Sequence, residues 1–372
     1  MRGGAELVAL WAQLASVMEL VTGVALAGVG TGLAVYVART RRPERQRDLL
    51  REALRIGLAV GAPLAVAIGI GASIYADALS GEKLAPVVFA LSAAAGWAAV
   101  IPGLVNGYWL GQQRRSLMLA LAVGSAALTL AAAAVAPPEF ILHVVVVCQA
   151  LPAAVLFVVA DADGTRARFR AHSHPLRRYV LPGLAIGLLG PLSMLLARGA
   201  VGEALSWHEA GVLQSLWRLS DWVCAFAGGV LSVHYLPRLA EARSGPRLAA
   251  AMGEAVKTIL IPSALIFVAL YLLHRPLLGL LYDPAFQAGN STVALFFAGS
   301  LVRIASWIPL FALYAMRRTR AIALGELLSL PLFAAGVLSL GAQVTLEAAG
   351  ALWLAAYVAY GIFNLWAARA RQ

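Results

Sequence analysis

Long apolar stretches alternate along the chain with short charged or Pro/Gly-rich breaks. A bilayer core about 30 Å thick needs roughly 20 apolar residues per helix, so apolar runs of about 18 residues or more predict membrane-spanning helices. Eleven such segments follow one another: 8–38, 54–75, 84–109, 117–136, 140–160, 179–198, 209–236, 254–273, 292–315, 321–341 and 349–367. The first and the seventh are longer than a bilayer requires, so we expect them to tilt, bend or protrude. The predicted fold class is all-α and polytopic.

Composition excludes a soluble domain. The 372 residues are 61% hydrophobic and 13% charged, with a mean hydropathy of +0.81, whereas about 25% of positions are charged in soluble proteins. The net charge of +11 is not accompanied by a basic face on a globular core or by a stacking platform, so we expect no nucleic-acid partner. Cys148 and Cys224 lie inside apolar runs, where they are expected to be small buried hydrophobes without a disulfide framework.

The arginines predict the orientation in the membrane, because short cytoplasmic loops carry an excess of Lys and Arg. Of the 29 Lys and Arg residues, 23 fall in turns on one side of the predicted spans, and seven of these lie between residues 39 and 55. This places the C-terminus in the cytoplasm. Eleven spans then leave Met1 on the outer face, whereas an even number with both ends inside is the ordinary outcome. We therefore expect one further helix to be missing upstream.

A long polar connection divides the predicted spans into two lobes. Residues 161–178 are basic and contain no apolar run, so we interpret them as a cytoplasmic linker between an N-terminal lobe, 1–160, and a C-terminal lobe, 179–372. The linker contains His172 and His174, but with no neighbouring Cys or matched carboxylates these histidines predict a solvated segment rather than a metal site.

The two lobes contain a repeat. Residues 15–39 align without a gap on residues 214–238 at an offset of 199, with six of 25 positions identical. Both segments run in the same predicted direction, and both end in Tyr-X-X-Arg at a cytoplasmic loop. A repeat of parallel sense implies two helical bundles related by a pseudo-two-fold axis along the membrane normal.

Several segments resemble a known transporter family. The segment GVLQSLWRLSDWVCAFAGGVLSVHYLPRLAEA at 211–242 has a Trp-rich start, a Leu-Ser-Asp triplet at 219–221, and a Leu-Pro pair followed by Arg238. These features resemble the Wzx-type flippases for O-antigen and enterobacterial common antigen, members of the MATE-like MOP exporter superfamily. The end of the first segment and the final GALWLAAYVAYGIFNLWAARAR at 350–371 are also similar to that family.

The resemblance implies a specific activity. Family members have twelve spans in two six-helix lobes, so it implies that the first helix is absent here. It implies ion-coupled, alternating-access transport of an undecaprenyl-diphosphate-linked oligosaccharide to the outer leaflet of a bacterial inner membrane. The process would be polysaccharide biosynthesis for lipopolysaccharide, and polymerase and chain-length proteins would be partners. It implies neither an enzyme nor a cofactor.

Ionisable side chains inside predicted spans are costly, and each is therefore a candidate functional residue. Arg218 and Arg303 lie at depths that suit a diphosphate headgroup, which guanidinium groups bind well. Trp217 is a candidate to stack on sugar, although tryptophans in membrane proteins more often form interfacial belts. Two other interpretations stay open. Arg218 and Asp221, three apart on one helix face, are close enough to neutralise each other, and Arg303 could snorkel to the outer interface.

Carboxylates within spans predict ion coupling, because burial changes how readily such a group gains and loses a proton. The candidates are Asp221, Glu19 and Glu326. Glu19 and Arg218 occupy equivalent positions of the repeat with opposite charge, so we expect them to face each other across the lobe interface and to exchange partners during transport.

Three other functions remain open at the level of sequence. A drug exporter and a peptidoglycan-precursor flippase belong to the same superfamily, and a membrane-embedded sugar polymerase or ligase is the alternative from another class. Outer-face chemistry usually needs acid/base residues on a substantial loop, and the predicted outer loops are short. Nor does the sequence contain P-loop, HExxH or GxSxG patterns in a suitable context.

Overall fold

The structure, a computed structural model, describes residues 4–26, 28–40, 42–81, 83–137, 140–161, 180–242, 245–282, 286–316 and 318–369. All but the first residue of the predicted linker 161–178 lie outside these ranges. Every regular element in the described ranges is a helix, which confirms the predicted all-α class. The helices are α1 (Gly4–Leu26), α2 (Val29–Arg39), α3 (Pro43–Ile70), α4 (Ala72–Ser80), α5 (Pro86–Ala98), α6 (Val100–Gly111), α7 (Arg115–Val135), α8 (Ile141–Asp161), α10 (Val180–Ala204), α11 (Trp207–Val230), α12 (Leu236–Ala242), α13 (Gly245–Ala255), α14 (Ile261–Leu281), α15 (Asn290–Ala315), α16 (Thr319–Glu326), α17 (Leu330–Leu340) and α18 (Leu346–Arg369).

Each of the eleven predicted spans coincides with one helix or with consecutive helices. Nine helical stretches of the described chain are long and apolar enough to cross a membrane. The predicted spans 140–160 and 179–198 correspond to α8 and α10. The architecture is that of a multi-pass membrane protein. Cys148 and Cys224 are free and buried, as predicted.

The first predicted span is a bent pair of helices. Helix α1 ends at Leu26 and α2 begins at Val29. Gly28, which precedes α2, has a φ of 74° in the left-handed region, where a residue without a Cβ avoids steric strain. The expectation that this segment tilts, bends or protrudes is therefore met by a bend.

The seventh predicted span is interrupted by a π-helical turn. Helix α11 continues through a π-helical segment, Leu231–Tyr235, into α12. Pro237 follows this segment. In a regular α-helix its ring would clash with the carbonyl of Val233, four residues earlier, and it has no N–H to donate to that carbonyl. The same arrangement recurs between α13 and α14, where the π segment Val256–Leu260 precedes Pro262. A wider turn at these positions accommodates the proline without ending the helix.

The chain divides into two compact units. One unit is Gln13–Leu195, and the other combines Met1–Ala12 with Leu196–Gln372. We call them the N-unit and the C-unit.

Helices of the N-unit approach one another closely at glycines. A Cβ added at Gly107 on α6 would lie 2.9 Å from the backbone oxygen of Gly30 on α2. A Cβ at Gly96 on α5 would lie 2.6 Å from the backbone oxygen of Met18 on α1. The apolar core between α1, α2, α3 and α6 is formed by seven buried side chains: Ala25, Val29, Leu33, Val37, Ala53, Val100 and Leu104.

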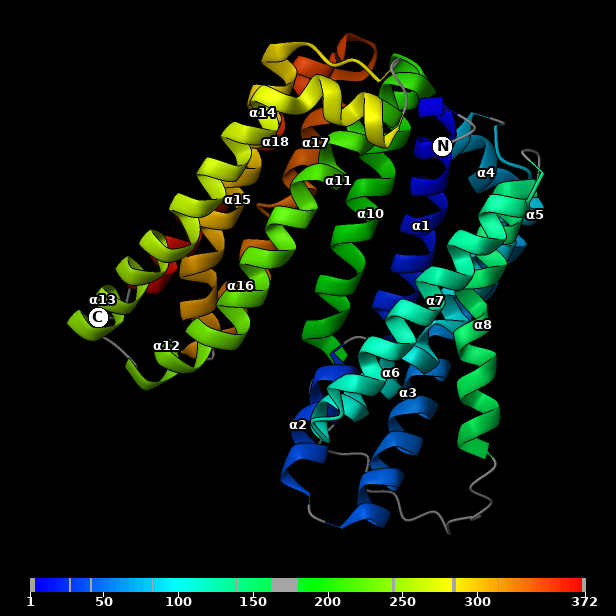
Figure 1. Cartoon of the computed structure of the whole chain (residues 1–372), viewed down its shortest axis with the longest axis vertical. Coiled ribbons are helices and arrows are strands. Elements are labelled where there is room, and N and C mark those ends of the chain that lie inside the picture. The colour runs from blue at the N-terminus through cyan, green and yellow to red at the C-terminus, as the bar shows by residue number, and fades with distance from the viewer. Residues whose placement is uncertain are drawn as a thin grey trace. The chain divides into compact units, whose positions relative to one another are not determined.

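The C-unit is assembled around α15, which packs along α18 and also contacts α11 and α14. Figure 1 shows these helices lying alongside one another in the green, yellow, orange and red part of the chain. The start of α11 is fixed by Ser206, whose hydroxyl accepts a hydrogen bond of 3.1 Å from the backbone N–H of Glu209. This Ser-X-X-Glu arrangement is typical of a helix N-terminus. The helices that carry Asp221 and Arg303 therefore belong to one packed unit.

Candidate functional site

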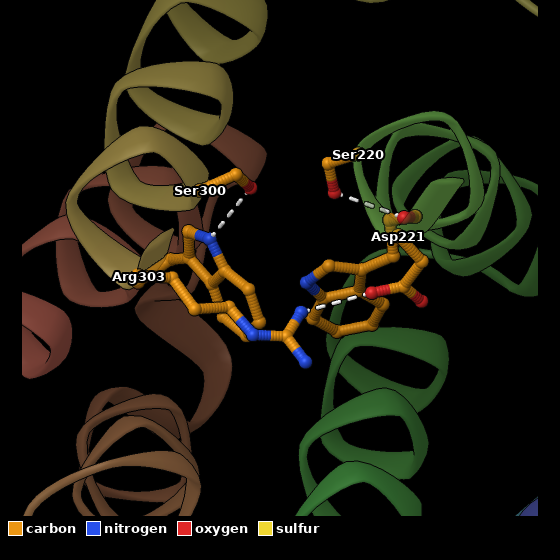
Figure 2. Close-up of polar contacts among 6 residues, drawn as sticks. Ser220, Asp221, Ser300 and Arg303 are labelled. Atoms are coloured by element: carbon orange, nitrogen blue, oxygen red, sulfur yellow. Dashed lines mark hydrogen bonds and ion pairs between the residues drawn. The ribbon is translucent and has the colours of Figure 1, made fainter. Parts of the chain in front are cut away.

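The structure brings together two predicted site residues from helices far apart in the sequence. Arg303 on α15 donates a hydrogen bond from Nη1 to Oδ1 of Asp221 on α11, at 2.9 Å. Figure 2 shows the two side chains pointing toward one another from their helices. Asp221 is the fourteenth residue after Trp207 at the start of α11, and Arg303 is the thirteenth after Asn290 at the start of α15. At 1.5 Å per residue, both lie about 20 Å along their helices, which explains why they can meet.

Three aromatic rings surround the guanidinium of Arg303. Its Cζ lies 5.1 Å from the ring centroid of Trp307, 5.7 Å from that of Tyr357 and 5.8 Å from that of Trp353. Such contacts attract a cation to the π face of a ring, and they strengthen when water is excluded. The Arg303 side chain is 20% exposed. It is therefore largely enclosed by these rings and by Asp221.

Trp353 is itself fixed in place. Its indole Nε1 donates to the hydroxyl of Ser300 at 3.3 Å. Its ring packs against Trp217 at 5.6 Å, Phe296 at 5.6 Å and Phe333 at 5.3 Å between centroids. We call Trp217, Phe296, Phe333 and Trp353 the aromatic cluster. Each is at most 1% exposed. The guanidinium of Arg303 therefore lies against the ring of Trp353, which is itself held by a hydrogen bond and by three buried aromatic neighbours.

Trp217 belongs to this cluster and is 1% exposed. In the conformation described here the ring contacts other rings rather than an open surface. Its predicted role as a sugar contact stays a prediction.

A second arginine contacts the aromatic cluster through Trp217. Arg198 on α10 is 2% exposed, and its Nε donates to Oε1 of Gln214 on α11 at 3.1 Å. Its Cζ is 5.9 Å from the ring centroid of Trp217. In the sequence this residue is the last of the predicted span 179–198. Helix α10 extends to Ala204, six residues beyond the predicted end of the span. Arg198 therefore lies within the helix and is buried.

Glu326 lies in a second polar group of the C-unit. The hydroxyl of Tyr360 on α18 donates to its Oε1 at 2.8 Å. Asn364, also on α18, is fully buried and donates from Nδ2 to the backbone oxygen of Ser306 at 3.4 Å. Glu326 is also close enough to Arg303 for an electrostatic interaction. Arg303 is thus paired with Asp221 and within electrostatic range of Glu326, whose hydrogen-bond donor is Tyr360.

Arg218 is not the partner of Asp221. Arg218 lies three residues before Asp221 on α11, but the ion pair that the structure records for Asp221 is with Arg303. The interpretation in which Arg218 and Asp221 neutralise each other is therefore replaced by a pair between Asp221 and Arg303. Arg218 is exposed and lies near Tyr282 at the end of α14. Burial raises the pKa of Tyr282, and the charge of Arg218 partly offsets this rise by lowering that pKa. Tyr282 in turn stacks on Phe286 at 5.0 Å.

Glu19 belongs to the N-unit, where it is an exposed residue of α1. Its predicted meeting with Arg218 stays a prediction. Among the described residues, no three His, Cys, Asp or Glu side chains gather as a metal site would require.

Sequence reasoning missed the residues of α18 that complete the site. Trp353, Tyr357, Tyr360 and Asn364 are spaced by four, three and four residues, which places them along one face of a helix. This spacing was visible in the sequence. It could not be told apart from ordinary core packing, because a stripe of aromatics predicts a buried face without identifying the charges that the face meets.

A scan against protein-family models finds no match, and a search of curated proteins finds none. Solved structures do match. The inward-facing conformation of a multidrug resistance MATE family transporter of the MOP superfamily superposes with a TM-score of 0.77 at 14% identity, covering 97% of this chain and 88% of that chain. An outward-facing conformation of a multidrug resistance MATE family transporter gives a TM-score of 0.65 at 14% identity, covering 99% of this chain and 88% of that chain. A MATE structure in the bent conformation gives 0.67 at 14% identity, also with 99% and 88% covered.

This chain has the fold of MATE transporters. At these identities the likeness concerns the fold alone. The arginine, carboxylate and aromatic groups of the C-unit therefore have to be interpreted from their own geometry.

Proposed function

We propose that the protein is a membrane transporter that works by alternating access and moves an undecaprenyl-diphosphate-linked oligosaccharide across the inner membrane of a bacterium. The observation that carries the proposal is the position of Arg303. A guanidinium inside a unit of apolar helices is costly, yet here it is surrounded by three rings and meets a carboxylate of another helix.

A diphosphate headgroup suits such a group. Guanidinium N–H donors are arranged as a planar fork that matches phosphate oxygens, and charge-assisted hydrogen bonds of this kind are the strong ones. In this proposal Arg303 binds the headgroup inside the C-unit. Arg218, which is exposed on the same helix as Asp221, receives or releases it nearer the outer end of α11. The polyprenyl tail stays in lipid.

The fold supports the transport part of the proposal. The chain forms two helical units, and its structural neighbours are transporters that have been solved in inward-facing and outward-facing conformations. Coupling to an ion is assigned to Asp221, Glu19 and Glu326. Of these, Glu326 has the more enclosed setting, with Tyr360 as hydrogen-bond donor.

Export of a cationic drug is the second candidate function. The names of the structural neighbours favour it, since they include a multidrug resistance transporter. In that case the carboxylate of Asp221 would be the ligand for the substrate, and Arg303 would be its competitor. The two candidates therefore assign opposite roles to the two members of one ion pair.

Replacement of Arg303 tests the proposal. Purified protein is reconstituted into vesicles with a fluorescent short-chain polyprenyl-diphosphate oligosaccharide, and the fraction of label that crosses the bilayer is followed with an impermeant quencher. We expect Arg303→Ala to abolish transport. Arg303→Lys should reduce it about tenfold, because an ammonium cannot reproduce the fork and a charged hydrogen bond is worth roughly 1.5–3 kcal/mol.

Arg275→Ala is the matched control. Arg275 is an exposed arginine of α14 in the same unit, and its Nη2 donates to Asn290 at 3.4 Å, away from Asp221. It should transport at the wild-type rate. The amount of protein and its thermal unfolding in detergent show whether each variant is folded. Unchanged transport of the diphosphate lipid by a folded Arg303→Ala protein rules the proposal out, and loss of cationic-dye export in Asp221→Asn alone favours the drug exporter.

A further inference from the structure

The guanidinium of Arg303 has two kinds of contact. Its Cζ lies near the rings of Trp307, Trp353 and Tyr357, and one of its nitrogens donates to a carboxylate. Among the described side chains, the hydrogen bond recorded for the guanidinium is the one from Nη1 to Asp221. A guanidinium has five N–H donors. The rings therefore hold the group in place, while Asp221 covers part of the edge that donates hydrogen bonds.

The two partners differ in how firmly they are held. The Arg303 side chain is 20% exposed, whereas that of Asp221 is 44% exposed. Asp221 has a short side chain on the surface of α11, and its recorded side-chain ion pair is with Arg303. Loss of that bond would leave the guanidinium against its three rings. It would leave the carboxylate able to turn toward its exposed side.

The other titratable groups around Arg303 are less able to move away from it or to replace Asp221. Glu326, the second carboxylate within electrostatic range, accepts a hydrogen bond from Tyr360. Cys224, one turn after Asp221 on α11, is 1% exposed, and it is a weak donor at most. Tyr357 already contacts the guanidinium through its ring. Asp221 is thus the group whose departure opens the hydrogen-bonding edge.

We infer that Asp221 is the resident counter-ion of an anion site at Arg303, and that a diphosphate binds there by displacing the carboxylate. This inference rests on the proposed function and adds how the same site is regulated. A buried charge needs a partner at all times, because an uncompensated one is strongly destabilising. In the empty protein Asp221 supplies the negative charge, and in the loaded protein the phosphate oxygens supply it.

Exchange of one anion for another has a consequence for transport. The guanidinium stays neutralised when the site is empty as well as when it is loaded, so neither form places a bare cation inside the C-unit. This arrangement lowers the affinity for the substrate, because the bond between Arg303 and Asp221 must break before the substrate can bind. Asp221 is therefore a competitor of the substrate and not one of its ligands.

Removal of the competitor tests the inference. Binding of inorganic pyrophosphate and of farnesyl diphosphate to the full chain in detergent is measured by calorimetry for the wild type and for Asp221→Asn. The amide has the shape of the carboxylate without its charge. We expect Asp221→Asn to bind both probes about tenfold more tightly, the ratio for one charged hydrogen bond that no longer has to be broken. Farnesyl diphosphate separates a lipid-linked headgroup from free pyrophosphate, and tighter binding of the farnesyl compound favours the lipid-linked source.

Two further proteins make the result specific. Glu347→Gln removes one negative charge at the exposed start of α18 and should bind like the wild type, which controls for net charge. Asp221→Asn combined with Arg303→Gln should bind neither probe. Equal affinity in the wild type and Asp221→Asn overturns the inference while leaving the diphosphate site in place. Weaker binding in Asp221→Asn also overturns it, because Asp221 would then position Arg303. Absence of binding in every protein overturns the proposed substrate as well.

Discussion

The C-unit and the N-unit differ in the polar groups of their interiors. In the described part of the C-unit, Arg198 and Arg303 contact aromatic rings, and Asp221 and Glu326 each accept a hydrogen bond from another helix. In the described part of the N-unit, the buried polar side chains are uncharged. Gln13, which is fully buried, donates from Nε2 to the backbone oxygen of Leu79 at 2.7 Å and to that of Leu195 at 3.3 Å.

The difference shows where binding chemistry can be placed in this fold. Close approach of helices at glycines, as at Gly96 and Gly107, gains van der Waals contact and leaves little room for long side chains. Helices of the C-unit also approach at glycines, since a Cβ added at Gly299 on α15 would lie 3.0 Å from the backbone nitrogen of Leu354 on α18. What the C-unit adds is a set of buried rings, which provide surfaces on which cations can rest. Arg198 and Arg303 contact such rings, whereas the buried Gln13 of the N-unit is satisfied by backbone carbonyls.

The largest effect should follow from removing the ring that supports Arg303. Trp353→Ala leaves a cavity within the aromatic cluster and is expected to lower the free energy of unfolding by about 3–5 kcal/mol. Trp353→Phe keeps a ring but loses the hydrogen bond to Ser300, which costs about 1 kcal/mol. Thermal and denaturant unfolding in detergent measure both. Trp366→Ala, on the same helix and 64% exposed, is the control, and a Trp353→Ala protein as stable as that control would contradict the role of the cluster.

Filling a glycine contact should have a smaller effect, confined to the N-unit. Gly96→Leu places a side chain against the backbone of Met18 on α1, where even a Cβ would be 2.6 Å from the oxygen. Overpacking of this kind costs about 1–3 kcal/mol. Gly124→Leu on α7 is the matched control, because nothing lies within 4 Å of a Cβ at that position. The two variants are compared by unfolding in detergent, and equal stabilities would show that α1 and α5 can separate freely.

The smallest effect should come from the buried amide of the N-unit. Gln13→Leu removes hydrogen bonds to two carbonyls that also belong to helices, so the free energy of unfolding should fall by about 1 kcal/mol. Transport per folded molecule should not change, since Gln13 serves packing. Gln113→Leu, which alters an exposed residue after α6, is the control. A transport defect in folded Gln13→Leu would mean that the N-unit also has a polar site and would weaken the contrast between the units.

The membrane spans could be predicted from local features of the sequence. Apolar length identified the spans but not α13 (Gly245–Ala255), most of which lies outside the predicted segment 254–273, and the excess length of the first and seventh segments predicted tilting, bending or protrusion. The structure breaks the first segment at Gly28 and carries the seventh through a π-helical turn at Leu231–Tyr235. Which device each segment uses was not predictable, because a left-handed glycine and a π-helical turn solve the same problem.

By itself, the sequence determined the apolar helical spans, and it placed Asp221 and Arg303 at similar depths, because rise per residue along a helix is fixed. Only the tertiary structure decided that Asp221 pairs with Arg303, 82 residues away, rather than with Arg218 three residues before it. The side chains of Arg218 and Asp221 leave α11 in directions that differ by part of a turn, and the rotation of each helix against its neighbours settles which one faces α15. That rotation results from packing of whole helix faces, including the aromatic stripe of α18, and no local pattern specifies it.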